Sequence, residues 1–409
     1  MAPGTETTSR PGPLSGIQVL DLTQFLAGPF STQILADLGA NVMKLEAPSG
    51  DWSRTLPPHF VGSDSCYFLS INRNKKGVVI DLKTLEGLDL VKRLAARCDI
   101  LMENFRPGVL DRLGLTFDDL SQRNPGLIWA SISGFGQDGP YRDRPAYDMI
   151  VQAMSGGMSL TGEPGRAAVR AGIPLGDLTA GMYAAIGTLA ALEERKQTGR
   201  GKFIDISMLD CQVAMLTYQA AYHLHSGEVP GRQGSGHESI PTYRSFVAAN
   251  QTGLVITANT ERMWKGLCEV LDRAALTEDQ RFVTNDDRFK NREALWPLLE
   301  QAFLQREAKE WVPLLLEAGV PVGEVNTVAD ALNDPQVRHR NMVLELENDQ
   351  GDQARVAGNP IKFRDVDEPP HHYPPSLGAD TRASLCQTLG LSDAEFEIYA
   401  KNGIVREQS

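Results

Sequence analysis

Gly16-Ile-Gln-Val-Leu-Asp-Leu22, Phe30-Ser-Thr-Gln-Ile-Leu-Ala-Asp-Leu38 and Asn41-Val-Met-Lys-Leu-Glu46 follow one another near the start of the chain, and they decide its fold. The first and third stretches are short apolar runs, which are typical of buried strands. The middle stretch has helical spacing, and Gly39 ends it. Together they predict a βαβ unit, the building block of a parallel sheet with helices on its faces.

The same alternation continues along the chain. It predicts strands at Val78–Leu82, Asp99–Asn104, Leu127–Ile132 and Phe203–Met208, and helices at Leu85–Ala96 and from Asp177 to Lys196. We therefore expect an α/β, Rossmann-like large domain over residues 1–225, completed by residues 330–409. Residues 226–329, with a predicted hairpin and two helices, are expected to form a smaller α+β domain.

The first βα turn tests whether this scaffold binds a dinucleotide. Glu46 ends the second strand, where a dinucleotide fold places its ribose-binding acid. The turn itself holds Gly28 followed by Pro29, and nothing there matches G-x-G-x-x-G. A Rossmann-like scaffold without NAD binding is therefore predicted.

The composition is that of a soluble globular protein, with 409 residues, 42% of them hydrophobic and 22% charged. The formal net charge of −12 argues against binding to nucleic acid or to an anionic membrane. The five cysteines contain no CxxC pair and the seven histidines no HExxH, so we expect neither disulfides nor a metal site. Residues 1–13 lack the apolar core of a signal peptide, and no long apolar span is evident, so a cytoplasmic protein is expected.

One acid stands out in Gly172-Ile-Pro-Leu-Gly-Asp-Leu-Thr-Ala-Gly-Met-Tyr-Ala-Ala-Ile-Gly187. Asp177 follows a Gly/Pro-rich turn and precedes a run of small and apolar residues. It can cap a helix by accepting backbone N–H bonds. A carboxylate near a helix start, among glycines that let a ligand approach, can also act as a nucleophile. Spacing alone leaves both readings open.

A set of short motifs, in order over almost the whole chain, resembles the class III CoA-transferases. These motifs are Leu14-Ser-Gly-Ile-Gln-Val-Leu-Asp-Leu-Thr23 with Ala27-Gly-Pro29, Leu38-Gly-Ala-Asn-Val-Met-Lys-Leu-Glu46, Asn72-Arg-Asn-Lys-Lys76, Glu103-Asn-Phe-Arg-Pro-Gly108, Gly176-Asp177, Thr198-Gly-Arg-Gly201 and Ser207-Met-Leu-Asp210. The resemblance implies that Asp177 attacks an acyl-CoA thioester and passes through an aspartyl anhydride and an aspartyl-CoA thioester. It also implies an interlaced homodimer, with CoA as substrate and no permanently bound cofactor.

The resemblance separates several activities. Racemases of the family carry Gly-His-Asp where this chain has Ala146-Tyr147-Asp148, so transfer is favoured over racemisation of a 2-methylacyl-CoA. The loop around His237 resembles that of transferases acting on C4–C6 dicarboxylates with succinyl-CoA, rather than the tetraglycine loop of the formyl-CoA:oxalate type. A CoA binder without catalysis, in which Asp177 only caps a helix, remains the alternative from another class.

The resemblance also carries over individual site residues. Tyr147 and Asp148 are expected beside Asp177, where they orient the intermediates. His237, Ser239 and Arg73 are expected to bind the second carboxylate of the substrate. The residues expected to contact CoA are Leu26, Ala27, Ile80, Lys83, Asn104, Phe105, Arg112 and Met208.

Overall fold

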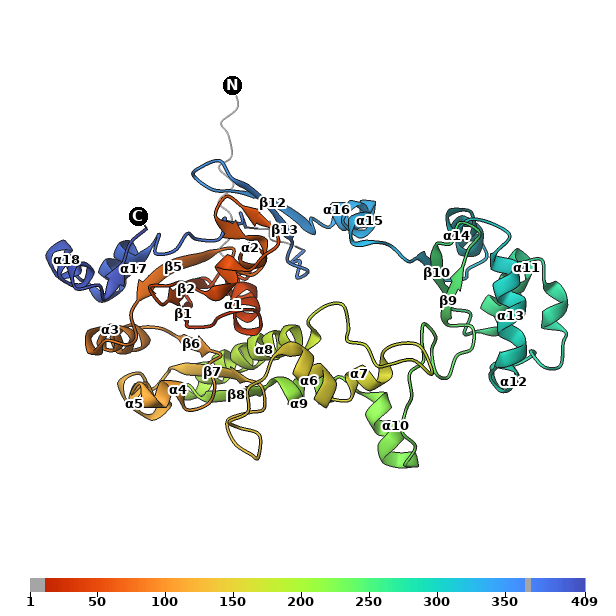
Figure 1. The fold of residues 1–409 in the computed structure, drawn as a ribbon, viewed down its shortest axis with the longest axis horizontal. Coiled ribbons are helices and arrows are strands. Elements are labelled where there is room, and N and C mark those ends of the chain that lie inside the picture. The colour runs from red at the N-terminus through yellow and green to blue at the C-terminus, as the bar shows by residue number, and fades with distance from the viewer. Residues whose placement is uncertain (1–11, 365–368, 409) are drawn as a thin grey trace, which may run out of the picture. The chain divides into compact units, whose positions relative to one another are not determined.

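The structure is a computed structural model that describes residues 12–364 and 369–408 (Figure 1). The chain forms two compact units. The larger comprises Met1–Gly157, Arg170–Ala221 and Arg338–Ser409, and the smaller comprises Met158–Val169 and Tyr222–Val337. The predicted boundaries, 225/226 and 329/330, lie a few residues from these limits, and the predicted small domain did not include 158–169.

A seven-stranded sheet forms the centre of the large unit, in the order β14-β5-β2-β1-β6-β7-β8. Its strands are β1 Gln18–Asp21, β2 Asn41–Glu46, β5 Lys75–Ile80, β6 Ile100–Glu103, β7 Ile128–Ser133, β8 Phe203–Ser207 and β14 Val405–Arg406. All neighbours pair in parallel except β14, which pairs antiparallel with β5. The six parallel strands have the order 3-2-1-4-5-6 of the doubly wound fold. The α/β, Rossmann-like prediction is thus confirmed.

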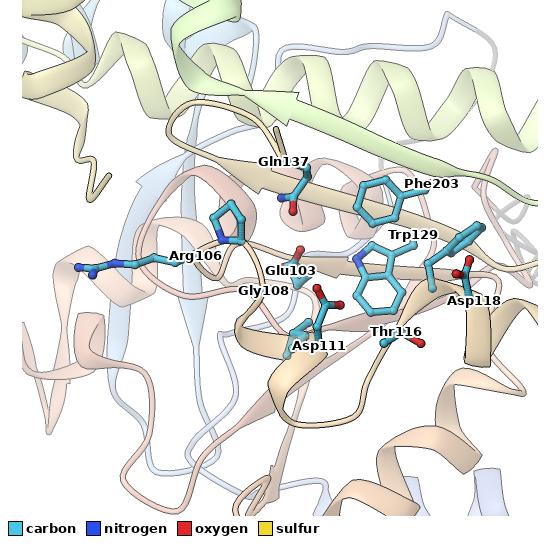
Figure 2. Close-up of a pocket in the computed structure, with 12 residues that line it drawn as sticks. Glu103, Arg106, Gly108, Asp111, Thr116, Asp118, Trp129, Gln137 and Phe203 are labelled. Carbon is cyan, nitrogen blue, oxygen red and sulfur yellow. The ribbon is translucent and has the colours of Figure 1, made fainter. Parts of the chain in front are cut away.

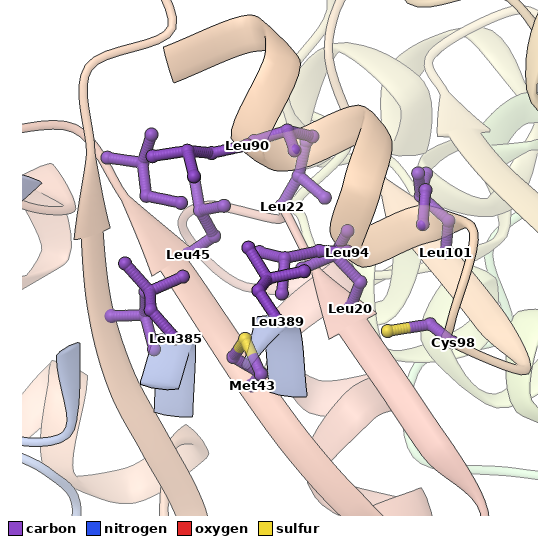
Figure 3. Close-up of a cluster of buried hydrophobic side chains, with 14 of the residues drawn as sticks. Leu20, Leu22, Met43, Leu45, Leu90, Leu94, Cys98, Leu101, Leu385 and Leu389 are labelled. Carbon is purple, nitrogen blue, oxygen red and sulfur yellow. The ribbon is translucent and has the colours of Figure 1, made fainter. Parts of the chain in front are cut away.

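Alternate strand residues face opposite sides of this sheet and enter two separate cores. Leu20, Met43 and their in-register neighbours pack against three helices, α3 Leu85–Ala95, α17 Thr381–Leu389 and α18 Asp393–Lys401 (Figure 3). The same core extends under α4 Val109–Arg112 and α5 Phe117–Arg123. Val19 and Val42 face the other side, against α1 Ala27–Asp37, α8 Leu175–Thr198 and α9 Met208–Ala214. The sheet is therefore covered on both faces.

The helix α8 packs closely on α1, and one glycine permits this. A Cβ atom on Gly181 would lie 2.6 Å from the carbonyl oxygen of Ala27. By length and composition alone, α8 could cross a membrane, a test that the core helix of a soluble protein also passes. Half of its most apolar stretch is buried, and the helix contacts α1, α9 and β7.

Shorter elements complete the large unit. They are η1 Trp52–Thr55, β3 Phe60–Val61, β4 Asp64–Ser65, α2 Cys66–Ile71, α6 Asp148–Met154 and the hairpin β12 Val343–Glu347 with β13 Gln353–Ala357. Two helices, α7 Gly157–Leu160 and α10 Tyr218–Ser226, begin in the large unit and run into the small one.

The small unit joins helices to a three-stranded antiparallel sheet, β11-β10-β9. Its strands are β9 Arg244–Val247, β10 Gly253–Ile256 and β11 Val322–Glu324. Its helices are α11 Glu261–Val270, η2 Ala274–Thr277, α12 Asn285–Lys290, α13 Arg292–Phe303, α14 Ala308–Glu317, α15 Val328–Asn333 and α16 Pro335–His339. Phe246, Trp264 and Trp311 lie in its core, which is built from this unit alone.

Candidate active site

The strand order places a ligand crevice between β1 and β6. In a doubly wound sheet, ligands bind outside the carboxyl ends of the strands, at the point where the strand order reverses. A cavity of about 460 Å³ opens there. It is lined by the segments that follow β1 and β6 and by residues from α2, α6, α8 and α9: Gln24, Phe25, Ala27, Tyr67, Asn104, Phe105, Arg106, Pro107, Ile132, Ser133, Gly134, Arg144, Ala146, Tyr147, Asp148, Met149, Asp177 and Met208.

Asp177 lies on the wall of this cavity, in the first turn of α8. The N-cap of α8 is Pro174, and no side chain of the cap residue bonds the helix. The cap comes from α6 instead, since Oδ1 of Asp148 accepts the backbone N–H of Gly176 at 2.7 Å and that of Asp177 at 3.4 Å. The reading of Asp177 as the helix cap is therefore wrong.

The carboxylate of Asp177 has no hydrogen bond or ion pair with any residue that the structure describes. Burial raises the pKa of Asp177, and the negative charge of Asp148 adds to this rise, so that the pKa is about 7. Such a carboxyl group is ionised in about half of the molecules near pH 7 and is more basic than an ordinary aspartate. An unpaired, basic carboxylate facing a cavity is suited to nucleophilic attack.

Asp148 belongs to a short hydrogen-bond chain that fixes the segment leading into α8. Its Oδ2 accepts the side-chain amide of Gln152 at 2.7 Å, and Oε1 of Gln152 accepts the backbone N–H of Ala171 at 2.9 Å. Asp148 therefore ties α6 to the segment before α8, and through it positions Asp177. Asp148 thus lies beside Asp177 as expected and contacts its backbone, whereas the expected action of Asp148 on the intermediates stays a prediction.

The backbone N–H groups at the start of α8, which could stabilise an oxyanion near Asp177, are all engaged. Those of Gly176 and Asp177 bond Asp148. Those of Leu175 and Leu178 bond the carbonyl oxygens of Ile173 and Pro174, at 2.9 and 3.0 Å. In this conformation, negative charge that develops on an oxygen near Asp177 must be stabilised by another hydrogen-bond donor.

Another wall is the β1–α1 loop, which the half-buried side chain of Asn104 and the buried side chain of Asp51 hold. Oδ1 and Nδ2 of Asn104 bond the N–H and the carbonyl of Gln24, each at 2.8 Å. Oδ1 of Asp51 accepts the N–H of Phe25 at 3.4 Å, and Oδ2 of Asp51 pairs with the buried Lys44 at 2.9 Å. Phe25 has a positive φ of 63° and contacts the ring of Tyr147 edge to face. Asn104 thus shapes the cavity as well as lining it.

Tyr67 is a cavity residue that the sequence patterns missed. It lies in α2, whose N-cap Ser65 accepts its backbone N–H. Burial raises the pKa of Tyr67 to about 12, with further contributions from the charges of Asp177, Asp51 and Asp148. The phenol is therefore protonated at neutral pH and can donate a hydrogen bond. The apolar run of α2, the helix that carries Tyr67, has only six residues and was too short to be distinguished from a loop.

The predicted CoA contacts divide into two groups. Ala27, Asn104, Phe105 and Met208 line the cavity with Asp177, Tyr147 and Asp148. The others lie outside its lining: Leu26, which is buried beside Ala27; Ile80, whose side chain is fully buried in the core; Lys83; and Arg112. Arg106 and Arg144, which were not predicted, line the cavity and supply cations there.

Arg73 requires a correction. Its guanidinium is buried at 3% exposure and forms two bonds with the carboxylate of Asp37, through Nε at 2.9 Å and through Nη2 at 2.5 Å. Nη1 donates to the carbonyl of Ala357 at 2.8 Å. Because these contacts use all three guanidinium nitrogens, Arg73 is a structural residue and not a candidate for binding a substrate carboxylate.

His237 and Ser239 lie in a loop of the small unit. The imidazole of His237 stacks on the ring of Tyr243, with centroids 5.6 Å apart and an angle of 7°. Nδ1 of His237 accepts the N–H of Ser239 at 3.1 Å. These contacts bring the two predicted substrate residues together. Among the residues that the structure describes, no group of three or more His, Cys, Asp or Glu side chains could hold a metal ion.

Comparison with known proteins identifies the family. The family model described as CoA-transferase family III matches residues 14–381. The succinyl-CoA:glutarate CoA-transferase of Mus musculus is 37% identical over 97% of this chain and 91% of its own, and the acetyl-CoA:oxalate CoA-transferase of Acetobacter aceti is 42% identical over 90% and 94%. The crystal structure of a CAIB/BAIF family protein from Brucella suis superposes with a TM-score of 0.84, at 38% identity, over 93% of this chain and 100% of that one. The chain belongs to CoA-transferase family III.

Proposed function

We propose that this CoA-transferase moves CoA from succinyl-CoA to a C4–C6 dicarboxylate, with Asp177 as the covalent carrier. The observation that carries the proposal is the unpaired Asp177 carboxylate on the wall of the cavity at the strand-order switch point. Its raised pKa makes it a better nucleophile than an ordinary aspartate, and the thioester that it attacks is already activated.

The reaction balances in four steps. The Asp177 carboxylate adds to the thioester carbonyl, and the C–S bond breaks to give a mixed anhydride and CoA thiolate. The thiolate attacks the aspartyl carbonyl, which releases succinate and leaves an aspartyl-CoA thioester. The acceptor carboxylate attacks that thioester, which forms a second anhydride and frees the thiolate. The thiolate then takes the new acyl group, and Asp177 is regenerated as a carboxylate.

The neighbouring side chains have distinct parts in this scheme. Asp148 holds the first turn of α8, and so the nucleophile, in place. Tyr67, protonated and facing the same cavity, donates to the oxygen that becomes negative at each attack. Arg106 and Arg144 neutralise the phosphates of CoA.

The choice of substrates rests on the relatives and on the loop of the small unit. Relatives from Mus musculus and Agrobacterium fabrum are named for succinate or succinyl-CoA with glutarate, and each covers most of this chain. We assign His237 and Ser239 to the distal carboxylate of the acceptor, since both offer hydrogen-bond donors in one loop. Oxalate, the acceptor named for the Acetobacter aceti relative, is the competing choice.

No histidine is among the cavity-lining residues, which all belong to the described part of the chain. This arrangement favours transfer over alpha-proton exchange, which needs an acid and a base on opposite faces of the carbon. Incubation of a branched acyl-CoA in deuterated buffer without an acceptor should therefore give no alpha-deuterium uptake.

We propose that a second copy of the chain binds to one face of the large unit. Three adjacent helices, α6, α8 and α9, expose large apolar side chains there, including Met149 at 56%, Ile186 at 60% and Val213 at 47%. Contiguous apolar surface of this kind is typical of an interface. We therefore expect a homodimer by sedimentation, and dissociation in an Ile186→Lys variant.

The central experiment traps the carrier. Succinyl-CoA and hydroxylamine are added to the enzyme, and peptide mass spectrometry locates the hydroxamate that hydroxylamine forms from an anhydride or thioester. We expect modification at Asp177 and none in Asp177→Asn, whereas Asp143→Asn, a surface acid with 82% exposure, should behave as wild type. Full CoA transfer by Asp177→Ala would refute the proposal. A panel of dicarboxylates with succinyl-CoA then ranks the acceptors.

A further inference from the structure

A second cavity, of about 380 Å³, extends from Glu103, the last residue of β6, to Trp129 and Phe203 near the amino ends of β7 and β8 (Figure 2). It shares only Arg106 and Pro107 with the candidate active site. Its walls come from β6, β7, β8, α4 and α5, and the residues used below are Glu103, Asp111, Phe117, Asp118, Trp129 and Phe203. The proposed transfer reaction uses none of these six.

The floor of this cavity holds two buried polar groups. Glu103 is 5% exposed, and Oε2 of its carboxyl accepts the backbone N–H of Phe105 at 2.8 Å. Trp129 is 3% exposed, and its indole N–H forms no hydrogen bond of normal geometry with a described residue. The carboxyl group of Glu103 is near enough to accept from it weakly, and this contact lowers the pKa of Glu103. A buried donor that is held this weakly is costly, and an occupant with an acceptor oxygen would satisfy it better.

The mouth of the cavity is acidic. Asp111 and Asp118 line it and are exposed, and neither forms an ion pair with a described residue. Arg106 also belongs to the lining, but its guanidinium points away from the carboxylates in Figure 2. Among the described residues, no group of three or more His, Cys, Asp or Glu side chains could hold a metal ion.

Aromatic rings form the remaining wall. Phe117 meets Trp129 and Phe203 edge to face, with centroids 6.5 and 5.7 Å apart, and the rings of Trp129 and Phe203 are 6.0 Å apart. Phe203 retains 38% exposure. Aromatic ring faces attract organic cations through the ring quadrupole, and carboxylates attract them through their negative charge. Rings beside carboxylates therefore favour such a cation twice.

We propose that this cavity binds a small organic ammonium compound that also carries an acceptor oxygen. The ammonium group meets Glu103 and the acids of the mouth, its alkyl part lies against Phe117 and Phe203, and its oxygen accepts the indole N–H of Trp129. The chain passes directly from Glu103 to Asn104 and Phe105, which line the first cavity. An occupant therefore contacts the segment that shapes the candidate active site.

The pH dependence of binding follows from Glu103. Burial raises its pKa, hydrogen bonds from Ser131, Phe105 and Trp129 offset part of that rise, and the charge of Asp111 adds to it, so that the pKa is about 7. The charged groups that face it are Asp111 and Asp118 from α4 and α5, Arg106 from its own loop and, by way of Gln137, Asp205 from β8. Because an alkyl ammonium stays charged across this range, affinity should rise about tenfold between about pH 6 and about pH 8, as Glu103 ionises.

Calorimetric titration of the full-length protein with aminobutanol tests the proposal, with butanediol as the neutral compound of equal length. We expect saturable binding at one site per chain for aminobutanol and none for butanediol. Glu103→Gln keeps the size of the side chain and should weaken binding at least about tenfold, and Asp118→Asn should weaken it less. Asp89→Asn, an exposed acid on α3, is the matched control and should bind as wild type.

Three results would overturn the proposal: no saturable binding of aminobutanol by the folded wild type, equal binding of butanediol, or unchanged affinity in both Glu103→Gln and Asp118→Asn. A cavity filled by a side chain of a second copy would give the first of these. Far-UV circular dichroism establishes that each variant is folded, and Asp118→Asn, at an exposed position, keeps the test decisive if Glu103→Gln does not fold.

Discussion

The proposed nucleophile should destabilise the folded protein, and the Asp177→Asn variant should show this. Asp177 has a pKa of about 7 in the folded chain, against an ordinary value of 3.8 in the unfolded chain, because burial and the charge of Asp148 disfavour its ionised form. Below about pH 4 both states hold the proton, and the group contributes nothing. As pH rises from about 4 to about 7, the unfolded state loses its proton first, so stability falls. Above about pH 7 the whole cost is present.

The size of the effect follows from the displacement of the pKa. A pKa raised from 3.8 to about 7 corresponds to at most about 4 kcal/mol, at about 1.4 kcal/mol for each tenfold change in the ionisation constant. Asp177 is half-buried and reaches solvent through the cavity, so screening lowers this figure, and we expect about 2 to 4 kcal/mol. Asparagine keeps the shape of the side chain and cannot ionise, and should therefore recover this amount at about pH 8.

Urea unfolding of wild type and Asp177→Asn at matched pH values measures the difference. We expect the variant to be the more stable protein at about pH 8 and the two curves to converge at about pH 4, with the transition of the large unit followed by near-UV circular dichroism. Asp143→Asn should show no such divergence, because its carboxylate is exposed. A stability difference that is constant with pH, or largest under acid conditions, would contradict the raised pKa and with it the unpaired state of the carboxylate.

Three further changes test the surroundings of the nucleophile. Asp148→Asn removes a charge that raises the pKa of Asp177 and should shift the acid limb of the pH–rate profile for hydroxamate formation to lower pH, while the weakened cap costs about 1 to 2 kcal/mol in thermal unfolding. Tyr67→Phe should lower kcat for CoA transfer at least about tenfold with KM little changed, and an equal loss in CoA affinity would instead indicate a binding role. Gly181→Ala should lower the free energy of unfolding by about 1 to 3 kcal/mol, since its Cβ would lie 2.6 Å from the carbonyl of Ala27, and an unchanged Tm would show that α8 can shift.

The elements that the sequence predicted well are those whose signals are local. Asn41–Glu46 was predicted with the limits that the structure has, and the helix predicted at Leu85–Ala96 ends one residue beyond α3. In each, an apolar period is bounded by a turn or a capping residue, as Thr84 shows at the start of α3. Such signals are complete within one segment, so they can be read without knowledge of the fold.

The features that were missed depend on partners far away in the chain. β14 has two residues and becomes a strand only by pairing with β5, from which it is separated by more than three-quarters of the chain. Arg73 looks like part of a basic surface run, yet it pairs with Asp37, 36 residues earlier. No local pattern marks either contact, and the substrate role predicted for Arg73 failed for that reason.

In the candidate site too, the residues that were predicted correctly follow from local signals, and the one that was read wrongly depends on a contact from far away in the chain. Ala27, Asn104 and Met208 follow the ends of β1, β6 and β8, so a parallel sheet must bring them to one edge. The cap of α8 was read wrongly, because Asp148 reaches it from 28 residues earlier, while Asp177 has the local appearance of a cap. An acid in a first turn whose capping bonds come from elsewhere is free to react.

Because Asp148 and not Asp177 caps α8, there is a consequence for the chemistry. The bonds from Asp148 hold Asp177 at the cavity, but they also use the two N–H groups nearest to its carboxylate. In the proposed reaction, a tetrahedral intermediate on Asp177 would draw its stabilisation either from a donor across the cavity, such as Tyr67, or from N–H groups that Asp148 releases during the reaction. The two routes predict opposite results for Tyr67→Phe combined with Asp148→Asn. If Tyr67 is the donor, the double variant should be slower than Tyr67→Phe alone, because Asp148→Asn also weakens the cap that holds Asp177, whereas released N–H groups would make Asp148→Asn partly restore its rate.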